Sequence, residues 1–288
     1  MDFLNLDPLL KRALEEDLGR GDLTTEAILE RAGSSREGAI QAQAAVLAKE
    51  TLILAGWPVF LRVFQLMDEI EAEVHFEEGA QVDRGTIVGK LQGKASVLLQ
   101  GERVALNFLQ RISGVATLTQ KYVQLVAHTQ AKILDTRKTT PLWRSLEKYA
   151  VRKGGGLNHR LGLYDGILIK ENHVAMAGGI EAALDACRGS LEVEIEVRNF
   201  EELSQAIDAG AGRVLLDNMS PLEVQKAVEI TRGRSLLEVS GGVHEGNVVE
   251  YAETGVHFIS LGILTHSSPS VDFSVSLHKS DDLKGTRH

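Results

Sequence analysis

From residue 131 onward, short runs of β-branched and aliphatic residues alternate with amphipathic segments in a regular order. Six such runs are present, at 131–135, 166–170, 191–197, 213–217, 235–240 and 256–262. Most of the segments between them space their apolar residues as helices do. Parallel strands must be joined by long crossover connections, which are usually helices, so this order predicts a parallel α/β sheet or barrel.

Six strands, with one further candidate at 157–160, are fewer than the eight of a complete α/β barrel. We therefore predict that residues 113–270 form an open or incomplete α/β barrel, and that this is the catalytic domain. A doubly wound sheet is the alternative, but no GxGxxG motif follows the first strand, as it would in a dinucleotide-binding sheet.

The first 112 residues have a different pattern and predict an N-terminal α+β sandwich domain. Apolar spacing indicates helices at 7–17 and 51–66, and strands broken by Gly-containing turns are expected at 37–49, 70–94 and 95–100. A long amphipathic stretch at 101–129 connects this domain to the barrel.

The end of the chain contains one further strand pattern. Residues 271–280 alternate apolar and polar side chains, which predicts a strand that rejoins the first domain. The polar residues 281–288 are expected to form a frayed tail.

The composition favours an intracellular protein that does not bind nucleic acid. Cys187 is the one cysteine in 288 residues, so no intramolecular disulfide can form and a reducing compartment is indicated. The first residues carry acids and lack a long apolar run, so we expect neither a signal peptide nor a membrane anchor, and a cytoplasmic location. With 40 acidic and 31 basic residues, the chain lacks the broad cationic character that general nucleic-acid binding needs.

Positive charge is nevertheless concentrated in one stretch, residues 135–173. It holds eight Lys or Arg against four Asp or Glu, although the whole chain has a net charge of −9. A local concentration of positive charge attracts anions into a cleft. The stretch therefore predicts a binding site for a small, highly anionic substrate.

The residues that could take part in binding or catalysis follow the ends of the expected strands. Functional groups in α/β barrels collect at the carboxyl ends of the strands. The residues at those ends are Thr136, Arg137, Lys138, His159, Arg160, Lys170, Glu196, Asp217, Ser240, Gly241, Gly242 and Gly262.

Each of these groups also has a simpler interpretation. Lys170 could be a surface lysine, His159 could cap a loop, and Glu196 and Asp217 could be N-caps or salt-bridge partners. Three further cations have helical spacing and are interpreted as a solvated helix face: Lys148, Arg152 and Lys153.

Taken together, the strand-end residues suit a substrate pair. Arginine forks bind planar carboxylates, and the number of cations exceeds what one phosphate needs, so a dicarboxylate and a polyphosphate are indicated. The two acids suit ribose hydroxyls or Mg²⁺, which binds one or two carboxylates together with substrate phosphates. The turn at 240–242 has N–H groups suited to a phosphate. The residues alone thus predict a transferase or lyase that acts on a carboxylate and a phosphorylated sugar.

At these residues the chain resembles the quinolinate phosphoribosyltransferases, also called carboxylating nicotinate-nucleotide pyrophosphorylases. The motifs DTRKTTP, GGGLNHRLGLYDGILIKENH, VEIEV, LLDN and EVSGG stand in the family's order. GDLTTEAI and GERVALNFLQRISGVAT extend the resemblance to almost the whole chain. The resemblance implies a small sandwich domain, an open barrel and a homodimer with shared active sites. It also implies conversion of quinolinate and phosphoribosyl pyrophosphate to nicotinate mononucleotide, pyrophosphate and CO₂, with Mg²⁺ and no organic cofactor, in NAD biosynthesis.

The resemblance also implies a role for each matched residue. Quinolinate carboxylates would be held by Arg137, His159, Arg160 and Lys170, with help from Thr136 and from Arg103 of the partner subunit. Three residues would be catalytic: Lys138 beside the pyrophosphate, and Glu196 and Asp217 at the ribose hydroxyls and the metal. The 5′-phosphate would be bound by Ser240, Gly241, Gly242 and Gly262.

Three other functions remain open at this point. A paralogous phosphoribosyltransferase, such as the one found with molybdate transport, would keep the phosphate turns but lose part of the carboxylate-binding set. A catalytically silent metabolite-binding protein could use the same pocket. A nucleic-acid binder would rest on the basic stretch alone.

Overall fold

The computed structural model describes residues 6–32, 39–189 and 192–280, which form two compact units. One unit is Leu118–Ser268, and the other comprises the described residues of Met1–Thr117 and Pro269–His288. The residues of the expected tail, 281–288, lie outside the described part of the chain.

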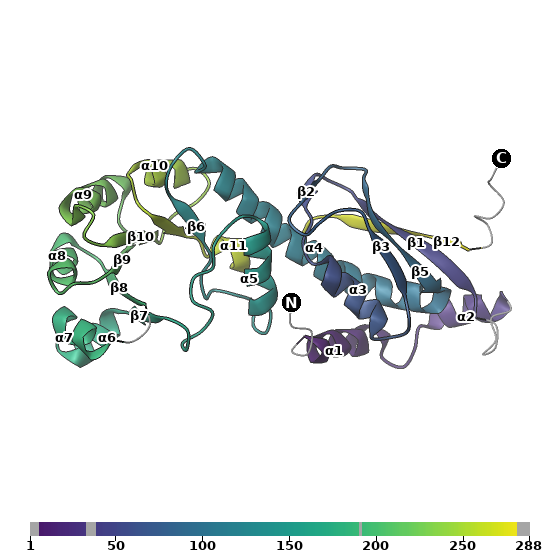
Figure 1. The fold of residues 1–288 in the computed structure, drawn as a ribbon. Helices are drawn as coiled ribbons and strands as arrows, with labels where there is room; N and C mark the ends of the chain where they lie inside the picture. Colours follow the sequence, from purple (N-terminus) through teal and green to yellow (C-terminus); the bar gives the residue numbers. More distant parts are fainter. Residues whose placement is uncertain (1–5, 33–38, 190–191, 281–288) are drawn as a thin grey trace. The chain divides into compact units, whose positions relative to one another are not determined.

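The first unit is built on a four-stranded antiparallel sheet in the order β12-β1-β5-β3 (Figure 1). Its strands are β1 Gln41–Ala48, β3 Glu71–Val74, β5 Ile87–Lys94 and β12 Phe273–Lys279. Strand β12 comes from the end of the chain and pairs with β1 from Ala42↔Lys279 to Ala48↔Phe273. Alternate residues of β1 are buried, because successive side chains of a strand point to opposite faces. Two short strands, β2 Leu52–Ile53 and β4 Gln81–Val82, form a separate pair.

Helices complete this unit. They are α1 Asp7–Leu18, α2 Leu23–Arg31, α3 Trp57–Gln65 and the first part of α4 Ala95–Leu125. Helix α1 confirms the helix predicted at 7–17. The helix predicted at 51–66 begins only at Trp57, since Gly56 has φ +96° and Pro58 occupies the first turn.

The strand predicted at 95–100 is wrong, because these residues begin helix α4. The buried positions from Leu98 through Gly101, Ala105, Phe108 and Ile112 follow helical spacing. A short apolar run without its continuation cannot distinguish a strand from a buried helix turn.

The second unit contains six parallel strands in the order β6-β11-β10-β9-β8-β7. Their bounds are β6 Lys132–Leu134, β7 Ile167–Ile169, β8 Val193–Val197, β9 Arg213–Asp217, β10 Leu236–Ser240 and β11 Phe258–Ser260. Strands β6 and β7 end the sheet and do not pair with each other within the described residues, so the barrel is open. The predicted fold class, a sandwich domain followed by an open α/β barrel, is confirmed. The candidate strand at 157–160 is only an isolated bridge between Leu157 and Leu134, and residue 191 of the predicted third strand lies outside the described part.

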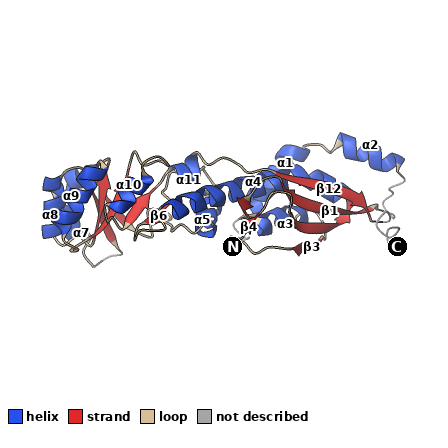
Figure 2. Cartoon of the chain, turned by 90° about the horizontal axis from the view of Figure 1, so that it is seen from above, coloured by secondary structure: helices blue, strands red, loops and turns tan. Residues whose placement is uncertain are grey.

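Helices follow the strands of the second unit. They are α5 Arg144–Lys153, α6 Glu171–Ala177, α7 Ile180–Ala186, α8 Phe200–Asp208, α9 Pro221–Thr231, α10 Val248–Glu253 and α11 Ile263–His266. Figures 1 and 2 show α7, α8 and α9 along one face of the strands. Among the described residues, no helix is both long and apolar enough to cross a membrane.

The inner face of the open barrel is unusually polar. Apolar side chains such as Ile195, Val214 and Val239 are buried on one face of their strands. By the two-residue period of a strand, the other face carries Glu194, Glu196, Arg213, Asp217, Glu238, Ser240 and Ser260. Barrel interiors are usually filled by aliphatic layers, so this polar face marks where the chemistry lies.

Candidate active site

One cavity of about 370 Å³ opens at the carboxyl ends of the barrel strands. It is lined by nine of the residues predicted from sequence: Thr136, Arg137, Lys138, His159, Arg160, Lys170, Glu196, Asp217 and Ser240. Because all six strands run parallel, the segments that follow them meet at one end of the sheet. Four more residues line the cavity that the sequence did not single out: Leu168, Leu215, Glu238 and Ser260.

Two arginines lie close enough in this cavity to repel each other. Burial and the positive charge of Arg137 lower the pKa of Arg160. The Nη1 atom of Arg160 donates to the carbonyl oxygen of Gly166 at 2.9 Å, which orients the guanidinium. A pair of neighbouring guanidinium groups is stabilised by a dianion, and a vicinal dicarboxylate supplies two negative charges at short separation.

Lys170 and Glu196 form an ion pair across neighbouring strands. Lys170 follows β7 and precedes α6, while Glu196 lies on β8, and Nζ donates to Oε2 at 2.7 Å. The lysine is half exposed and the carboxylate is mostly buried. An anion that binds Lys170 must therefore compete with Glu196, and a cation or ribose hydroxyl that binds Glu196 releases the lysine.

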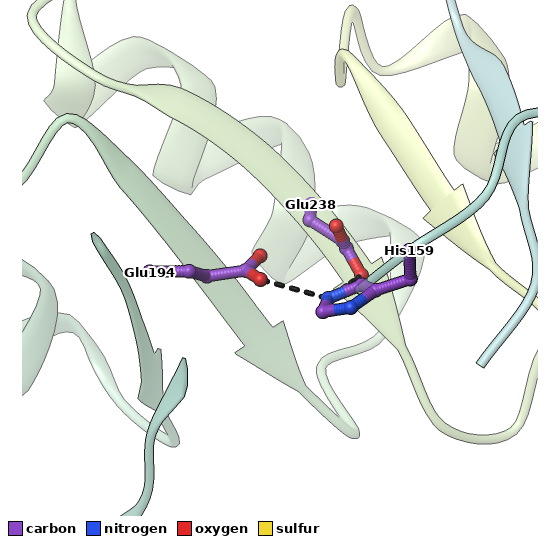
Figure 3. Close-up of side chains that lie close together, drawn as sticks. All are labelled: His159, Glu194 and Glu238. Carbon is purple, nitrogen blue, oxygen red and sulfur yellow. Dashed lines mark hydrogen bonds and ion pairs between the residues drawn. The ribbon is translucent and has the colours of Figure 1, made fainter. Parts of the chain in front are cut away.

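Both ring nitrogens of His159 already have protein partners. The backbone N–H of Arg160 donates to Nδ1 at 2.8 Å, so Nδ1 carries no proton in this arrangement. The proton then lies on Nε2, which donates to Oε2 of Glu194 at 2.9 Å (Figure 3). The ring is held at both nitrogens, and it can bind a substrate carboxylate only by exchanging one of these partners.

A buried network continues below His159. Arg213 on β9 pairs with Glu194 at 3.1 Å and closely with Glu238, whose other oxygen accepts from the hydroxyl of Ser260. Burial and the charge of Glu194 raise the pKa of Glu238 to about 7. Although burial opposes it, the carboxylates of Glu238 and Glu194 raise the pKa of Arg213. The sequence did contain a sign of this network. Each of the strands VEIEV, RVLLD and LLEVS has a charged residue at a position that faces the inside of the barrel.

The turn after β10 requires glycine. Gly241 has φ +90° and Gly242 has φ +68°, both in the left-handed region. A Cβ on Gly241 would lie 2.1 Å from Oδ1 of Asn218. Within the described hydrogen bonds, the N–H groups of the two glycines have no acceptor, so they can receive a phosphate oxygen. Gly262 adjoins the cavity, since a Cβ there would lie 3.0 Å from Cδ of Lys138.

Comparison with known proteins matches both units to one family. The model of the quinolinate phosphoribosyl transferase C-terminal domain matches residues 115–276, and that of the N-terminal domain matches residues 22–113. The chain belongs to the quinolinate phosphoribosyl transferase family. The resemblance noted in the sequence is thereby confirmed.

Individual members of the quinolinate phosphoribosyl transferase family are similar along their whole length. A Bacillus subtilis protein named "Probable nicotinate-nucleotide pyrophosphorylase [carboxylating]" is 41% identical over 290 residues, covering 98% of this chain and 96% of the relative. A chloroplastic "Nicotinate-nucleotide pyrophosphorylase [carboxylating]" of Arabidopsis thaliana is 38% identical over 297 residues, covering 95% of this chain and 83% of the relative. The solved structure of NadC from Streptococcus pyogenes has a TM-score of 0.90 at 38% identity and covers 97% of this chain and 98% of that one.

Four residues assigned from the family resemblance do not line the cavity: Arg103, Gly241, Gly242 and Gly262. Arg103 is exposed on helix α4, outside the unit that forms the cavity. Its role in a partner's site stays a prediction.

The interpretation of Lys148 as part of a solvated helix face is wrong. The side chain of Lys148 is 1% exposed and is paired with a fully buried Asp135. Helical spacing after Trp143 placed Lys148 correctly on α5, but spacing alone does not show which face of the helix is covered.

Two sets of side chains could hold a metal ion. Ligand atoms of His159, Glu194 and Glu238 lie within 4.8 Å of one another, which is close enough for a shared ion. Arg213 already pairs with both carboxylates of that set. The predicted pair, Glu196 and Asp217, instead lines the main cavity beside the cations that suit phosphates. That setting fits Mg²⁺, which combines one or two protein carboxylates with substrate phosphates.

Proposed function

We propose that this protein transfers the phosphoribosyl group of phosphoribosyl pyrophosphate to quinolinate and removes one carboxyl group. The products are nicotinate mononucleotide, pyrophosphate and CO₂, and the reaction belongs to NAD biosynthesis. The observation that carries the proposal is the cavity in which cations for a dicarboxylate adjoin two carboxylates and a glycine turn. The family match over both units and the names of the similar proteins support it.

Arg137 and Arg160 bind the two carboxylates of quinolinate, and Lys170 adds a third positive charge. The mutual repulsion of the arginines is relieved when the dianion arrives, so part of the binding energy comes from the protein's own electrostatics. Thr136 lines the same wall and supplies a hydroxyl. His159 keeps its ring in place through Glu194 and the Arg160 amide and forms the floor of this subsite.

Glycosyl transfer needs negative charge near the ribose and positive charge near the leaving group. As the bond between the anomeric carbon and pyrophosphate breaks, the ribose becomes oxocarbenium-like, and the carboxylates of Glu196 and Asp217 stabilise it. Lys138 neutralises the departing pyrophosphate, while the 5′-phosphate is held by Ser240, Gly241, Gly242 and Gly262. Glu196 and Asp217 would hold Mg²⁺, which when bound supplies further neutralisation of the pyrophosphate charge. The pyridine nitrogen then forms the new bond to the anomeric carbon.

Decarboxylation follows from the product of the first step. The ribosylated ring nitrogen is cationic, so it can stabilise the electron pair that remains when the adjacent carboxyl group leaves as CO₂. A proton from water then takes the position of that carboxyl group. No prosthetic group and no protein nucleophile are needed.

We further propose that the protein acts as a homodimer, in which Arg103 of one protomer completes the site of its partner. Arg103 is exposed and does not line the cavity of its own chain. The reaction and the single cysteine suit a reducing, cytoplasmic environment, and neither nucleic acid nor membrane is a partner.

A product assay tests the proposal. Purified protein is incubated with phosphoribosyl pyrophosphate, Mg²⁺ and either quinolinate or nicotinate, and nicotinate mononucleotide is quantified by chromatography. We expect product from quinolinate and little or none from nicotinate, which lacks the second carboxylate. Ligand-dependent melting without product would indicate a silent binding protein, and product from nicotinate alone would overturn the assignment of the acceptor.

A further inference from the structure

Beside the site, a buried ion pair takes no part in the proposed chemistry. Nζ of Lys148 on α5 lies 2.5 Å from Oδ1 of Asp135, with side-chain exposures of 1% and 0%. Burial raises the pKa of Asp135 and lowers that of Lys148, while each partner's charge acts in the opposite direction. A buried ion pair adds little stability over an apolar pair of similar volume. We therefore look for its role in the backbone groups that it holds in place.

The pair holds the backbone of the loop that carries Arg160. Nζ of Lys148 also donates to the carbonyl oxygen of His159 at 2.8 Å, and the N–H of His159 donates to Oδ1 of Asp135 at 2.9 Å. Nδ2 of Asn158 donates to Oδ2 of Asp135 at 2.5 Å and to the carbonyl oxygen of Lys148 at 2.9 Å. Both polar groups of the His159 backbone are thus fixed by one ion pair.

The same pair fixes the other half of the carboxylate subsite. Asp135 directly precedes Thr136 and Arg137, and His159 directly precedes Arg160. The ion pair therefore ties together the two chain segments that carry the two guanidinium groups. These groups repel each other, so the segments need a link that resists their separation.

We propose that the Asp135–Lys148 ion pair is a positioning device that sets the spacing of Arg137 and Arg160 and so determines affinity for a vicinal dicarboxylate. The inference rests on the proposed function, because it assigns the two arginines to quinolinate. Asp135 and Lys148 are positioning residues, since neither lines the cavity. Their effect should fall on the dicarboxylate and not on the phosphoribosyl donor, whose phosphate turn lies at the end of β10.

The test separates positioning from stability with paired variants. Lys148→Met alone leaves the buried carboxylate of Asp135 unpaired and should lower the Tm strongly. The double variant Asp135→Asn/Lys148→Met removes both charges and should recover most of that loss. In the double variant we expect the KM for quinolinate to rise by about tenfold to a hundredfold, as a small misplacement of binding groups does, with the KM for phosphoribosyl pyrophosphate nearly unchanged. Lys153→Met, which removes a lysine from the same helix, is the control and should leave both KM values unchanged.

Amide exchange gives a readout that does not depend on turnover. In the double variant the peptide containing residues 157–161 should exchange about tenfold faster than in the control, the effect of losing one hydrogen bond of ordinary strength. If the double variant does not fold, Lys148→Arg replaces it, because a guanidinium keeps the positive charge beside Asp135 but changes the geometry of the links to Asp135 and to the carbonyl oxygen of His159. We expect that variant to raise the KM for quinolinate about tenfold.

Two results would overturn the inference. One is a folded double variant, or Lys148→Arg, with wild-type quinolinate KM and wild-type exchange. The other is an equal rise in KM for both substrates, which would make the pair a support of the fold alone. If the wild-type protein forms no product from quinolinate, the proposed function fails instead, and the exchange measurement alone decides whether the pair positions the loop.

Discussion

The stability of this protein should fall with rising pH because of one buried carboxyl group, Glu238. Its pKa is raised from the ordinary 4.5 to about 7 by burial and by the neighbouring Glu194. A group whose pKa is raised in the folded state contributes stability that is fully present below the unfolded pKa and is lost as the pH rises through the folded pKa. Protonated Glu238 is therefore the form that the folded protein favours, and its stabilising contribution is lost mostly as the pH rises from the unfolded pKa of 4.5 to the folded pKa of about 7.

The size of the effect follows from the two pKa values. A difference of one pKa unit corresponds to about 1.4 kcal/mol, so the full difference is about 3 kcal/mol. Over an accessible window from pH 5.5 to 8.5, the part that changes is about 2 kcal/mol. Glu238→Gln removes the titration and keeps the shape, so the free energy of unfolding of this variant minus that of the wild type should increase by about 2 kcal/mol across the window.

The assay is urea unfolding at several pH values. Trp143 lies in the same unit as Glu238, so a Trp57→Phe background makes its fluorescence report on that unit. An exposed residue serves as the control, Glu229→Gln on α9, and its difference from the wild type should be flat with pH. A Glu238→Gln difference that is flat, or that grows toward low pH, would refute the reasoning.

Three further predictions concern activity. Arg160→Ala should lower kcat/KM for quinolinate by about a hundredfold or more, because two charge-assisted hydrogen bonds are lost. The circular dichroism spectrum should be unchanged. Near-normal turnover would show that Arg160 is not part of the site. Arg103→Ala and Lys138→Ala should each be inactive and recover partial activity when mixed under conditions of subunit exchange, because a hybrid dimer has one intact site; no recovery would contradict the shared site. Gly241→Ala should raise the KM for phosphoribosyl pyrophosphate, because its Cβ meets Asn218, whereas Gly233→Ala, at φ +73° with nothing within 4 Å, should lose only about 1–2 kcal/mol of stability and leave that KM unchanged.

The sequence predicted most of the barrel because its local signals agree with its global order. Each of the six runs predicted as barrel strands contains an observed strand, and nine of the residues predicted at the strand ends line one cavity. Alternation of strand and helix makes the strands of the sheet parallel, and parallel strands have their carboxyl ends at the same edge. That argument needs no side-chain contacts, so it predicts that Arg137 and Asp217 line the cavity as well as the order of the fold.

What sequence could not supply were features decided by tertiary burial. Residues 95–100 are apolar enough for a strand, and only the continuation through α4 makes them helical. Lys148 looks like a surface lysine until the carboxylate of Asp135, thirteen residues earlier, is found buried against it. Arg213 and Glu238 are separated by 25 residues along the chain, and only the pairing of β9 with β10 brings them together. These contacts depend on which charged groups are buried together in the folded protein. The spacing of residues along the sequence does not show this.

The central claim is that one cavity performs both glycosyl transfer and decarboxylation on the same acceptor. The most direct measurement follows quinolinate labelled with ¹³C in the carboxyl group next to the ring nitrogen, with phosphoribosyl pyrophosphate and Mg²⁺ present. The account predicts labelled CO₂ and unlabelled nicotinate mononucleotide in equal amounts, with neither formed when phosphoribosyl pyrophosphate is left out. Label retained in the nucleotide, or CO₂ released without the phosphoribosyl donor, would contradict it.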